Sequence, residues 1–447
     1  MSTVNYPVSG GGRAGVRFQL DGLGATVIPE QTAEVDRFSA LELSSMQFNL
    51  LQGRARHLGV SPRFIDVIRT FATPAGHTPP GFRVELTLKR DGLLEADLVR
   101  DISYDADSIK RPTSVIFSAD SANPYEVAPI APLLGNLTCN PGIVYDLFIN
   151  NPKANVGGKF TTRDEVMEEL GRILGPGVDV SVELNNPFEP DFDKILEECE
   201  VFKRILSPYR LVVKVPHTGP VNGDNVGQLL EGDKRFSLPY DAPATADALR
   251  GHNLALKLRE NGYRINYTLM FEPYQTSLAL QAKPYFINSF VRHRGKQSAA
   301  IQRLLGFYDL TGEREHLVAL RETLLAGDYL PKGDGEHDLL DVLRIGRDLL
   351  AYRQFGTAEG SDGLDGVRHN LRWLRQSNLP DTRLIICSME GDYNYPDIDR
   401  LMADPEYADI VDRVIITAEP GYLARFTSAN QVVSYQRRFM NAAATAK

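Results

Sequence analysis

The sequence predicts an α/β protein built on a closed, parallel (β/α)8 TIM barrel. Eight short apolar runs follow Pro112, and most neighbouring runs are separated by a segment with amphipathic helical periodicity. Continuous apolar runs are typical of strands that are buried on both faces of a parallel sheet. The number of runs favours a closed barrel over a doubly wound open sheet, which is the architectural alternative.

The expected barrel occupies residues 112–447. Its eight predicted strands, in chain order, are residues 115–120, 133–140, 178–183, 210–214, 264–268, 285–289, 383–388 and 413–417. The spacing of apolar residues predicts helices over residues 162–174 and 192–206, each between two consecutive strands.

Residues 1–111 are expected to form an accessory α+β lobe beside the barrel, without catalytic chemistry of its own. Ser61 followed by Pro62 predicts the start of a helix, and alternation over residues 82–88 predicts a strand. The glycine-rich segment 10–15 matches the spacing of a dinucleotide-binding loop. The sequence predicts no strand before this segment, so a flexible loop is expected there.

A helical insertion, residues 295–381, is expected after the sixth strand. About ninety residues separate this strand from the next, which is far longer than an ordinary barrel loop. Residues 338–352 within it carry apolar residues at helical spacing. Such a segment could cover or shape the active end of the barrel, or serve as an oligomer contact. His337 and Asp338 have metal-ligating side chains, but a surface turn and helix N-cap are expected.

Composition restricts the classes of partner and compartment. The net charge of -9 argues against general nucleic-acid binding, which normally needs a basic face. The three cysteines are widely spaced, so neither a disulfide framework nor a zinc site is expected, and a cytoplasmic location follows. No apolar run is long enough to span a membrane, and the N-terminus lacks a signal-peptide pattern.

Lys214 is the first candidate for chemistry. It follows the apolar run Leu211-Val-Val and precedes Val215-Pro216, so it is expected inside the fold at the end of the fourth barrel strand. Burial in a low-dielectric site disfavours the ammonium and is expected to lower the lysine pKa, which would free the amine to attack a carbonyl carbon. The alternative is a lysine that leaves the strand into solvent.

Polar residues also occur at the carboxyl ends of the other predicted strands. In a (β/α)8 barrel these ends converge on one mouth. The expected set is Asp120, Asn140, Glu183, Lys214, Thr268, Ser289 and Ser388. Lys214 could form a carbinolamine and then a Schiff base, while Glu183 could move protons through a water held by Thr268. Asp120 could take the proton of the hydroxyl whose carbon becomes an aldehyde.

Several motifs in this order resemble the transaldolase family, including its short fructose-6-phosphate aldolase branch. The resemblance covers roughly residues 114–426, interrupted by the insertion. The matching segments are Asp120-Ser-Ala-Asn123, Thr138-Cys-Asn140-Pro-Gly142, Glu183, Val213-Lys214-Val215-Pro216, Thr268-Leu-Met-Phe271 and Ser289-Phe-Val-Arg-His-Arg294. The resemblance implies Schiff-base chemistry at Lys214 without a metal or organic cofactor. It also implies acid/base catalysis by Asp120, substrate positioning by Asn140 and Ser289, and a catalytic water held by Glu183 and Thr268.

One departure from the family bears on the substrate. The family's seventh strand typically ends in a serine and then a basic residue, whereas this chain has Cys387-Ser388-Met389-Glu390. Ser388 could still bind substrate, but Glu390 would repel a phosphate. Arg292 or Arg294 could supply the missing positive charge. We therefore expect aldol transfer or cleavage on a specialised carbonyl or sugar substrate rather than the standard pentose-phosphate reaction.

Two other function classes fit the same sequence. Asp120, Glu183, Glu390 and Glu419 could all face the mouth, and their oxygens would suit magnesium or manganese in a metal-dependent lyase or isomerase. The protein could also be a non-catalytic member of the family that binds a ligand or partner. The sequence does not identify donor, acceptor or oligomeric state, and a homo-oligomer is compatible with it.

Overall fold

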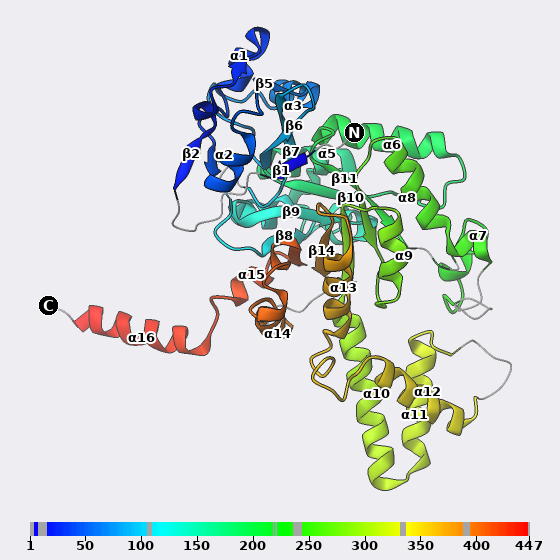
Figure 1. Ribbon diagram of the computed structural model, residues 1–447. Coiled ribbons are helices and arrows are strands. Elements are labelled where there is room, and N and C mark those ends of the chain that lie inside the picture. Colours follow the sequence, from blue (N-terminus) through cyan, green and yellow to red (C-terminus); the bar gives the residue numbers. More distant parts are fainter. Residues whose placement is uncertain are drawn as a thin grey trace.

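The chain folds around a closed barrel of eight parallel strands (Figure 1). The computed structural model describes residues 4–7, 16–104, 110–217, 219, 221–235, 244–330, 337–387 and 394–445. The barrel strands are β8 (Ile116–Asp120), β9 (Leu134–Cys139), β10 (Asp179–Glu183), β11 (Leu211–Pro216), β12 (Ile265–Thr268), β13 (Phe286–Phe290), β14 (Arg383–Cys387) and β15 (Val414–Ala418). They follow one another around the barrel in chain order, and β15 closes onto β8. All eight predicted strands and the predicted barrel are confirmed.

Helices surround this barrel. They are α4 (Pro124–Val127), α5 (Arg163–Leu174), α6 (Phe192–Leu206), α7 (Thr245–Ala248), α8 (Arg250–Glu260), α9 (Gln275–Gln281), α13 (Asp365–Gln376), α14 (Tyr395–Met402) and α15 (Tyr422–Arg425). A capping box formed by Thr162 and Glu165 begins α5. The largest apolar cluster lies where these helices pack on the outward side chains of the strands.

The inside of the barrel is layered. Towards the amino ends of the strands it is apolar, with Ile116, Val212, Phe286 and Ile385 among its buried residues. Towards the carboxyl ends the interior becomes polar. Three hydrogen bonds link buried side chains there, from Asn136 Nδ2 to Ser118 Oγ (2.9 Å), from Asn266 Nδ2 to Ser181 Oγ (3.0 Å) and from Asn288 Nδ2 to Asn266 Oδ1 (2.6 Å). The candidate site lies on this polar layer.

The N-terminal residues form sheet and helix elements with a separate apolar cluster. Strands β1 (Val4–Pro7), β3 (Thr26–Val27), β5 (His57–Val60), β6 (Phe82–Leu88) and β7 (Leu93–Arg100) make one sheet, and β2 (Arg17–Gln19) pairs with β4 (Glu42–Ser44). The helices are α1 (Thr32–Val35), α2 (Ser45–Leu51) and α3 (Pro62–Phe71). The strand expected over residues 82–88 is confirmed, and Ser61 caps α3 as expected. The expectation that no strand precedes segment 10–15 is wrong, because β1 pairs with β6 there, and the segment itself lies outside the described residues. That residues 1–111 form a lobe of their own stays a prediction.

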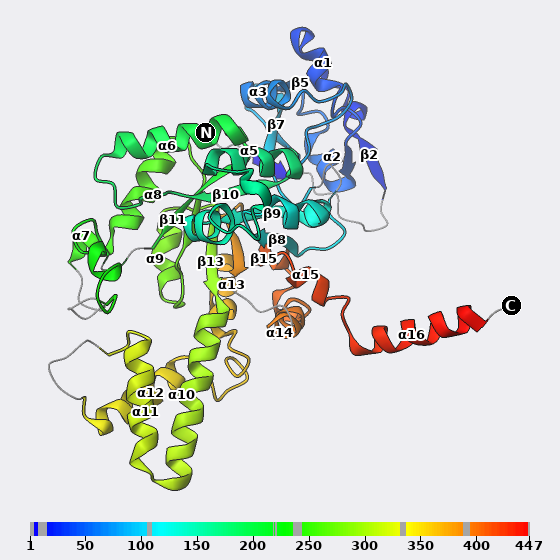
Figure 2. The ribbon, with the colours of Figure 1, turned by 180° about the vertical axis from the view of Figure 1, so that it is seen from behind.

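Three long helices follow β13, namely α10 (Val291–Thr311), α11 (Arg314–Ala326) and α12 (Leu339–Tyr352). They enclose their own apolar cluster. Figures 1 and 2 show them at the end of the molecule opposite the N-terminal elements. Asp338 caps α12 as expected, because its Oδ1 accepts a hydrogen bond from Leu340 N at 2.8 Å. Helix α13 falls within the predicted insertion range 295–381, but it packs on β13 and β14 as a barrel helix does.

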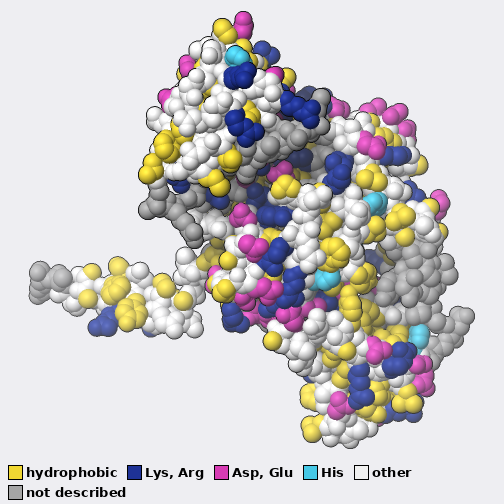
Figure 3. Space-filling view, in the orientation of Figure 1, with side chains coloured by type: hydrophobic (Ala, Val, Ile, Leu, Met, Phe, Trp, Pro, Cys, Tyr) yellow, Lys and Arg dark blue, Asp and Glu magenta, His cyan; other side chains and the backbone are white. Residues whose placement is uncertain are grey.

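The last helix, α16 (Asn430–Thr445), extends away from the rest of the chain (Figure 1). None of its residues is buried. Figure 3 shows hydrophobic side chains on its surface, and the exposed residues include Val433, Phe439 and Met440. No helix among the described residues is both long and apolar enough to cross a lipid bilayer.

Candidate active site

A cavity of about 290 Å³ opens at the carboxyl ends of the barrel strands. Its lining residues are Asp120, Thr138, Asn140, Pro141, Glu183, Lys214, Thr268, Leu269, Asn288, Phe290, Cys387 and Thr417. Five of the residues predicted from sequence therefore meet here, namely Asp120, Asn140, Glu183, Lys214 and Thr268. We call this cavity the mouth cavity.

Lys214 lies inside the barrel and not in solvent. Its strand β11 pairs with β10 so that Lys214 is directly beside Glu183, and with β12 so that it is beside Asn266. Only 5% of Lys214 is exposed. Its Nζ lies 3.4 Å from Glu183 Oε2, so the ammonium has an acidic partner on the neighbouring strand. A buried ammonium paired with a carboxylate is the principal ionisable feature of the cavity.

The expected lowering of the Lys214 pKa is wrong. Burial does lower this pKa, but the negative charges of Glu183 and Asp120 outweigh burial and raise the pKa above its ordinary value. Lys214 therefore rests as an ammonium, and the amine must lose a proton before it can act as a nucleophile. The sequence could not show this, because Asp120 and Glu183 are distant along the chain.

The two carboxyl groups are suited to take that proton. Burial raises the pKa of Asp120 despite the opposing charge of Lys214, and Glu419 raises it further. Burial likewise raises the pKa of Glu183, again against the effect of Lys214. The buried Oδ1 of Asp120 has no hydrogen-bond partner among the described residues. One cation thus faces two carboxyl groups that both accept protons more readily than usual.

Two further side chains near Lys214, Asn140 and Cys387, restrict which residue can act as the nucleophile. Asn140 Oδ1 accepts a hydrogen bond from Ile143 N at 2.9 Å, which fixes the orientation of its amide beside the cavity. Burial raises the pKa of the Cys387 thiol, whose Sγ lies 3.4 Å from Ser289 O. Since the thiolate is the reactive form of cysteine, Cys387 is not a ready nucleophile, and Lys214 remains the nucleophile of the set.

Other predicted site residues lie elsewhere. Ser289 was expected at the mouth, but its Oγ accepts a hydrogen bond from Asn370 Nδ2 of the outer helix α13 at 2.7 Å. Arg294 is buried in ion pairs with Glu272 (3.0 Å) and Asp365, and neither Arg294 nor the exposed Arg292 lines the cavity. The structure therefore does not bring Ser289, Arg292 or Arg294 together with the lining residues of the mouth cavity, and their contact with substrate stays a prediction. Ser388 and Glu390 lie outside the described residues.

Four polar lining residues were missed from the sequence. They are Thr138, Asn288, Cys387 and Thr417. Thr417 is the last residue of a predicted strand, and Asn288 immediately precedes Ser289. The sequence did not show which side chains of each strand point into the barrel. An alternation of inward and outward residues would have revealed Asn288, but both sides of these strands are buried, so the sequence shows no clear alternation.

The arrangement is less suited to a metal ion. Within the parts of the chain that the structure describes, no three His, Cys, Asp or Glu side chains are grouped so that they could hold one. The Lys214 ammonium stands beside Glu183 and would repel a cation bound to that carboxylate. Among the described residues that line the mouth cavity, no cationic side chain other than Lys214 could bind a phosphate.

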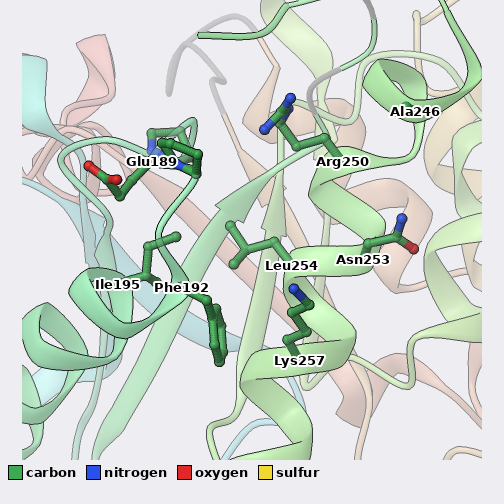
Figure 4. Close-up of a pocket in the computed structure, with 10 residues that line it drawn as sticks. Glu189, Phe192, Ile195, Ala246, Arg250, Asn253, Leu254 and Lys257 are labelled. Carbon is green, nitrogen blue, oxygen red and sulfur yellow. The ribbon is translucent and has the colours of Figure 1, made fainter.

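A separate cavity of about 240 Å³ lies outside the barrel, between α6 and α8 (Figure 4). Glu189, Arg250 and Lys257 contribute charged side chains to it. Lys257 is directed over the ring of Phe192, with its Nζ 5.4 Å from the ring centre. None of the strand-end residues lines this cavity, so the mouth cavity is the better candidate active site.

Comparison with known proteins gives no family assignment. No family model matches this chain, and no curated protein sequence matches it. The candidate site therefore depends on its own geometry and on the motifs in the sequence.

Proposed function

We propose that this protein is a class I aldolase or transaldolase-like transferase that acts on a carbonyl substrate through a Schiff base at Lys214. The observation that carries the proposal is the buried Lys214 ammonium beside Glu183 and Asp120, whose pKa values are both raised. Such a site can transfer the lysine proton locally and then use the free amine as a nucleophile. The motif resemblance to transaldolases supports the same chemistry.

The first half of the reaction joins substrate and enzyme. A carboxylate takes one proton from Lys214, and the Nζ lone pair attacks the substrate carbonyl carbon. The carbonyl oxygen takes up a proton and becomes the carbinolamine hydroxyl. Loss of that hydroxyl as water, aided by proton donation from Glu183, leaves a protonated imine. Thr268 lines the same cavity and could hold the water.

The second half breaks a carbon–carbon bond. Asp120 accepts the proton of the hydroxyl on the carbon β to the imine, and that carbon leaves as an aldehyde. The electrons of the broken bond move to the α carbon and form an enamine. The enamine then attacks an acceptor aldehyde, which is transfer, or takes a proton, which is cleavage. Hydrolysis of the resulting imine frees Lys214.

The proposal is tested by borohydride trapping. The wild-type protein is incubated with unphosphorylated and phosphorylated ketoses and with simple aldehydes, reduced with borohydride, and analysed by intact mass and peptide mapping. We expect a mass increase equal to the reduced fragment, located at Lys214. Lys214→Ala should abolish the adduct, whereas the matched variant Lys257→Ala, in the outer cavity, should retain it.

Two results would overturn the proposal. One is the absence of a Lys214 adduct across the whole panel, and the other is an adduct that persists undiminished in Lys214→Ala. If a measurable activity were instead lost on addition of chelator and restored by magnesium or manganese, the metal-dependent alternative would replace the Schiff-base mechanism.

A further inference from the structure

A second cavity, of about 420 Å³, lies beside the mouth between the segment that follows β12 and the inserted helices. Aromatic rings dominate its walls. Phe271 and Tyr274 come from the segment after β12, His293 from α10, and Tyr329 and Tyr352 from the later part of the insertion. We call the cavity lined by these five residues the aromatic subsite.

The aromatic subsite shares a wall with the mouth cavity. The rings of Phe271 and Phe290 lie 4.7 Å apart, centre to centre. Phe271 lines the aromatic subsite and Phe290 lines the mouth cavity, so this ring pair separates the two spaces. A substrate with its carbonyl carbon at Lys214 would therefore have to extend past this ring pair to place a further group in the aromatic subsite.

The segment that carries Phe271 is held in place. Gln275 Oε1 accepts hydrogen bonds from the backbone nitrogens of Phe271 (2.8 Å) and Glu272 (2.9 Å). Leu269, which lines the mouth cavity, has a φ of 57°, a strained value for a residue other than glycine. Backbone strain of this kind persists where the surroundings fix it and is found disproportionately at ligand sites.

Glu272 also fixes the inserted helices to this segment. It accepts hydrogen bonds from two buried arginines, Arg294 of α10 at 3.0 Å and Arg353 just after α12 at 2.8 Å. The insertion thus forms a fixed wall of the subsite. Arg294 is further neutralised by Asp365. Two cations against two carboxylates leave no excess positive charge to attract a phosphate or carboxylate ligand.

We propose that the aromatic subsite binds an uncharged planar ring that forms part of the carbonyl substrate. The ring of Tyr352 lies 6.3 Å from the ring of Tyr274 and is 47% exposed, so Tyr352 presents an aromatic surface on which a ligand ring can stack. The assignment of the ring to the substrate rests on the proposed Schiff-base function. The binding of a ring in the aromatic subsite does not depend on that function.

The first experiment measures ring binding without any chemistry. Benzyl alcohol is used as the probe in ligand-observed saturation-transfer NMR. We expect binding to wild type and to Lys214→Ala, and a loss of affinity of about 3- to 10-fold in Tyr352→Ala, because an aromatic contact is removed. Tyr352→Phe, which keeps the ring, should restore binding. Phe307→Ala is the matched control, since Phe307 is an exposed aromatic of α10 outside the subsite.

The second experiment connects the subsite to Lys214. Borohydride trapping rates are compared for 3-phenylpropanal and propanal. We expect about 3- to 10-fold faster trapping of the aromatic aldehyde by wild type, and equal rates in Tyr352→Ala. Equal rates in wild type would show that the ring does not belong to the substrate, and would overturn the proposal. Benzyl alcohol binding that is absent, or unchanged in Tyr352→Ala, would overturn it as well.

The two proposals can fail separately. If no compound of the whole carbonyl panel, these two aldehydes included, forms a Lys214 adduct while benzyl alcohol binds through Tyr352, the Schiff-base function is wrong and the substrate assignment of the ring falls with it. If both aldehydes form Lys214 adducts at equal rates, the Schiff-base function stands and the aromatic subsite is refuted as a substrate site.

Discussion

Buried carboxylates are fully paired at the amino end of the barrel and incompletely paired at the carboxyl end. At the amino end, Asp179 is fully buried and both of its oxygens are paired, with Arg100 Nε at 2.6 Å and with Arg264 Nη1 at 3.1 Å. At the carboxyl end, Asp120 and Glu183 share the single cation Lys214, and Asp120 Oδ1 has no partner among the described residues. The same type of side chain is neutralised at one end and left reactive at the other.

This contrast distinguishes structural from chemical charge. A buried charge is costly unless it is paired and hydrogen-bonded, so the Asp179 cluster holds the N-terminal strand β7 against the barrel without leaving a reactive group. The carboxyl groups at the mouth are incompletely paired, so burial raises their pKa values despite the opposing charge of Lys214. Perturbed carboxyl groups in a cavity are typical of functional sites. Substitutions at the two ends should therefore have opposite consequences.

The largest effect on stability is expected from Asp179→Ala. The change would leave the buried Arg100 guanidinium and the partly buried Arg264 guanidinium without their shared carboxylate, which should lower the free energy of unfolding by about 3–5 kcal/mol. Urea denaturation measures this loss. The matched control Asp309→Ala removes an exposed partner of Arg347 and should cost at most about 1 kcal/mol. Similar losses in the two variants would show that the amino-end cluster is not a structural ion pair.

A smaller effect, on reactivity, is expected from Glu183→Gln. The charge of Glu183 raises the pKa of Lys214, so its removal should lower that pKa and increase the fraction of free amine at a given pH. The rising limb of borohydride trapping against pH should move to lower pH. At pH values below the midpoint, the fraction of free Lys214 amine should be about tenfold larger in Glu183→Gln than in wild type. The midpoint of the trapping rate against pH is the quantity to compare, because loss of Glu183 as a proton donor also changes the maximum rate.

The exposed Glu197→Gln is the control for this measurement, and its profile should match that of wild type. A shift of the Glu183→Gln midpoint to higher pH would contradict the electrostatic account of the mouth.

Asp120→Asn should make the protein more stable at pH 7. The pKa of Asp120 is raised in the folded state, so the folded protein loses stability relative to the unfolded chain as the pH rises above about 3.9, the ordinary aspartate pKa. Asparagine removes this loss, and the expected gain is about 0.5–2 kcal/mol. The gain should be smaller at pH 4 and disappear well below it, where aspartate is protonated in both states. Urea denaturation at pH 7 and at pH 4 compares the stability of Asp120→Asn with that of wild type. A lower stability of the variant at pH 7 would refute the prediction.

The sequence was sufficient for the barrel because the signal for a doubly buried strand is local. Val180, Val182, Val213 and Ile386 are buried members of continuous apolar runs, and such runs mark strands whichever way each side chain points. Lys214, Glu183 and Asp120 were identifiable because polar residues interrupt or end those runs. Parallel strands bring their carboxyl ends together, so chain order alone placed these residues at one mouth.

The remainder of the site depends on distant contacts that the sequence does not show. Arg294 forms ion pairs with Glu272 and Asp365, which are 22 and 71 residues away along the chain, so its charge is neutralised away from the mouth cavity. The rise in the Lys214 pKa likewise depends on carboxylates from two other strands. The aromatic subsite was unforeseen for the same reason, since its rings come from a barrel loop and from separate parts of the insertion.

Ser289→Ala is expected to have the smallest effect on reactivity, and it tests whether position at a strand end is sufficient for a site residue. Ser289 Oγ accepts a hydrogen bond from Asn370 on the outer side of the barrel, whereas the preceding Asn288 lines the mouth cavity. We expect Lys214 trapping within about twofold of wild type and a stability loss of about 1–2 kcal/mol, because the buried Asn370 amide loses its acceptor. Asn288→Ala, as the adjacent comparison, should slow trapping about tenfold or more by disturbing groups beside Lys214. If Ser289→Ala slowed trapping as much as Asn288→Ala, both faces of β13 would influence the reaction, and the distinction between the inward residue and the outward one would not hold.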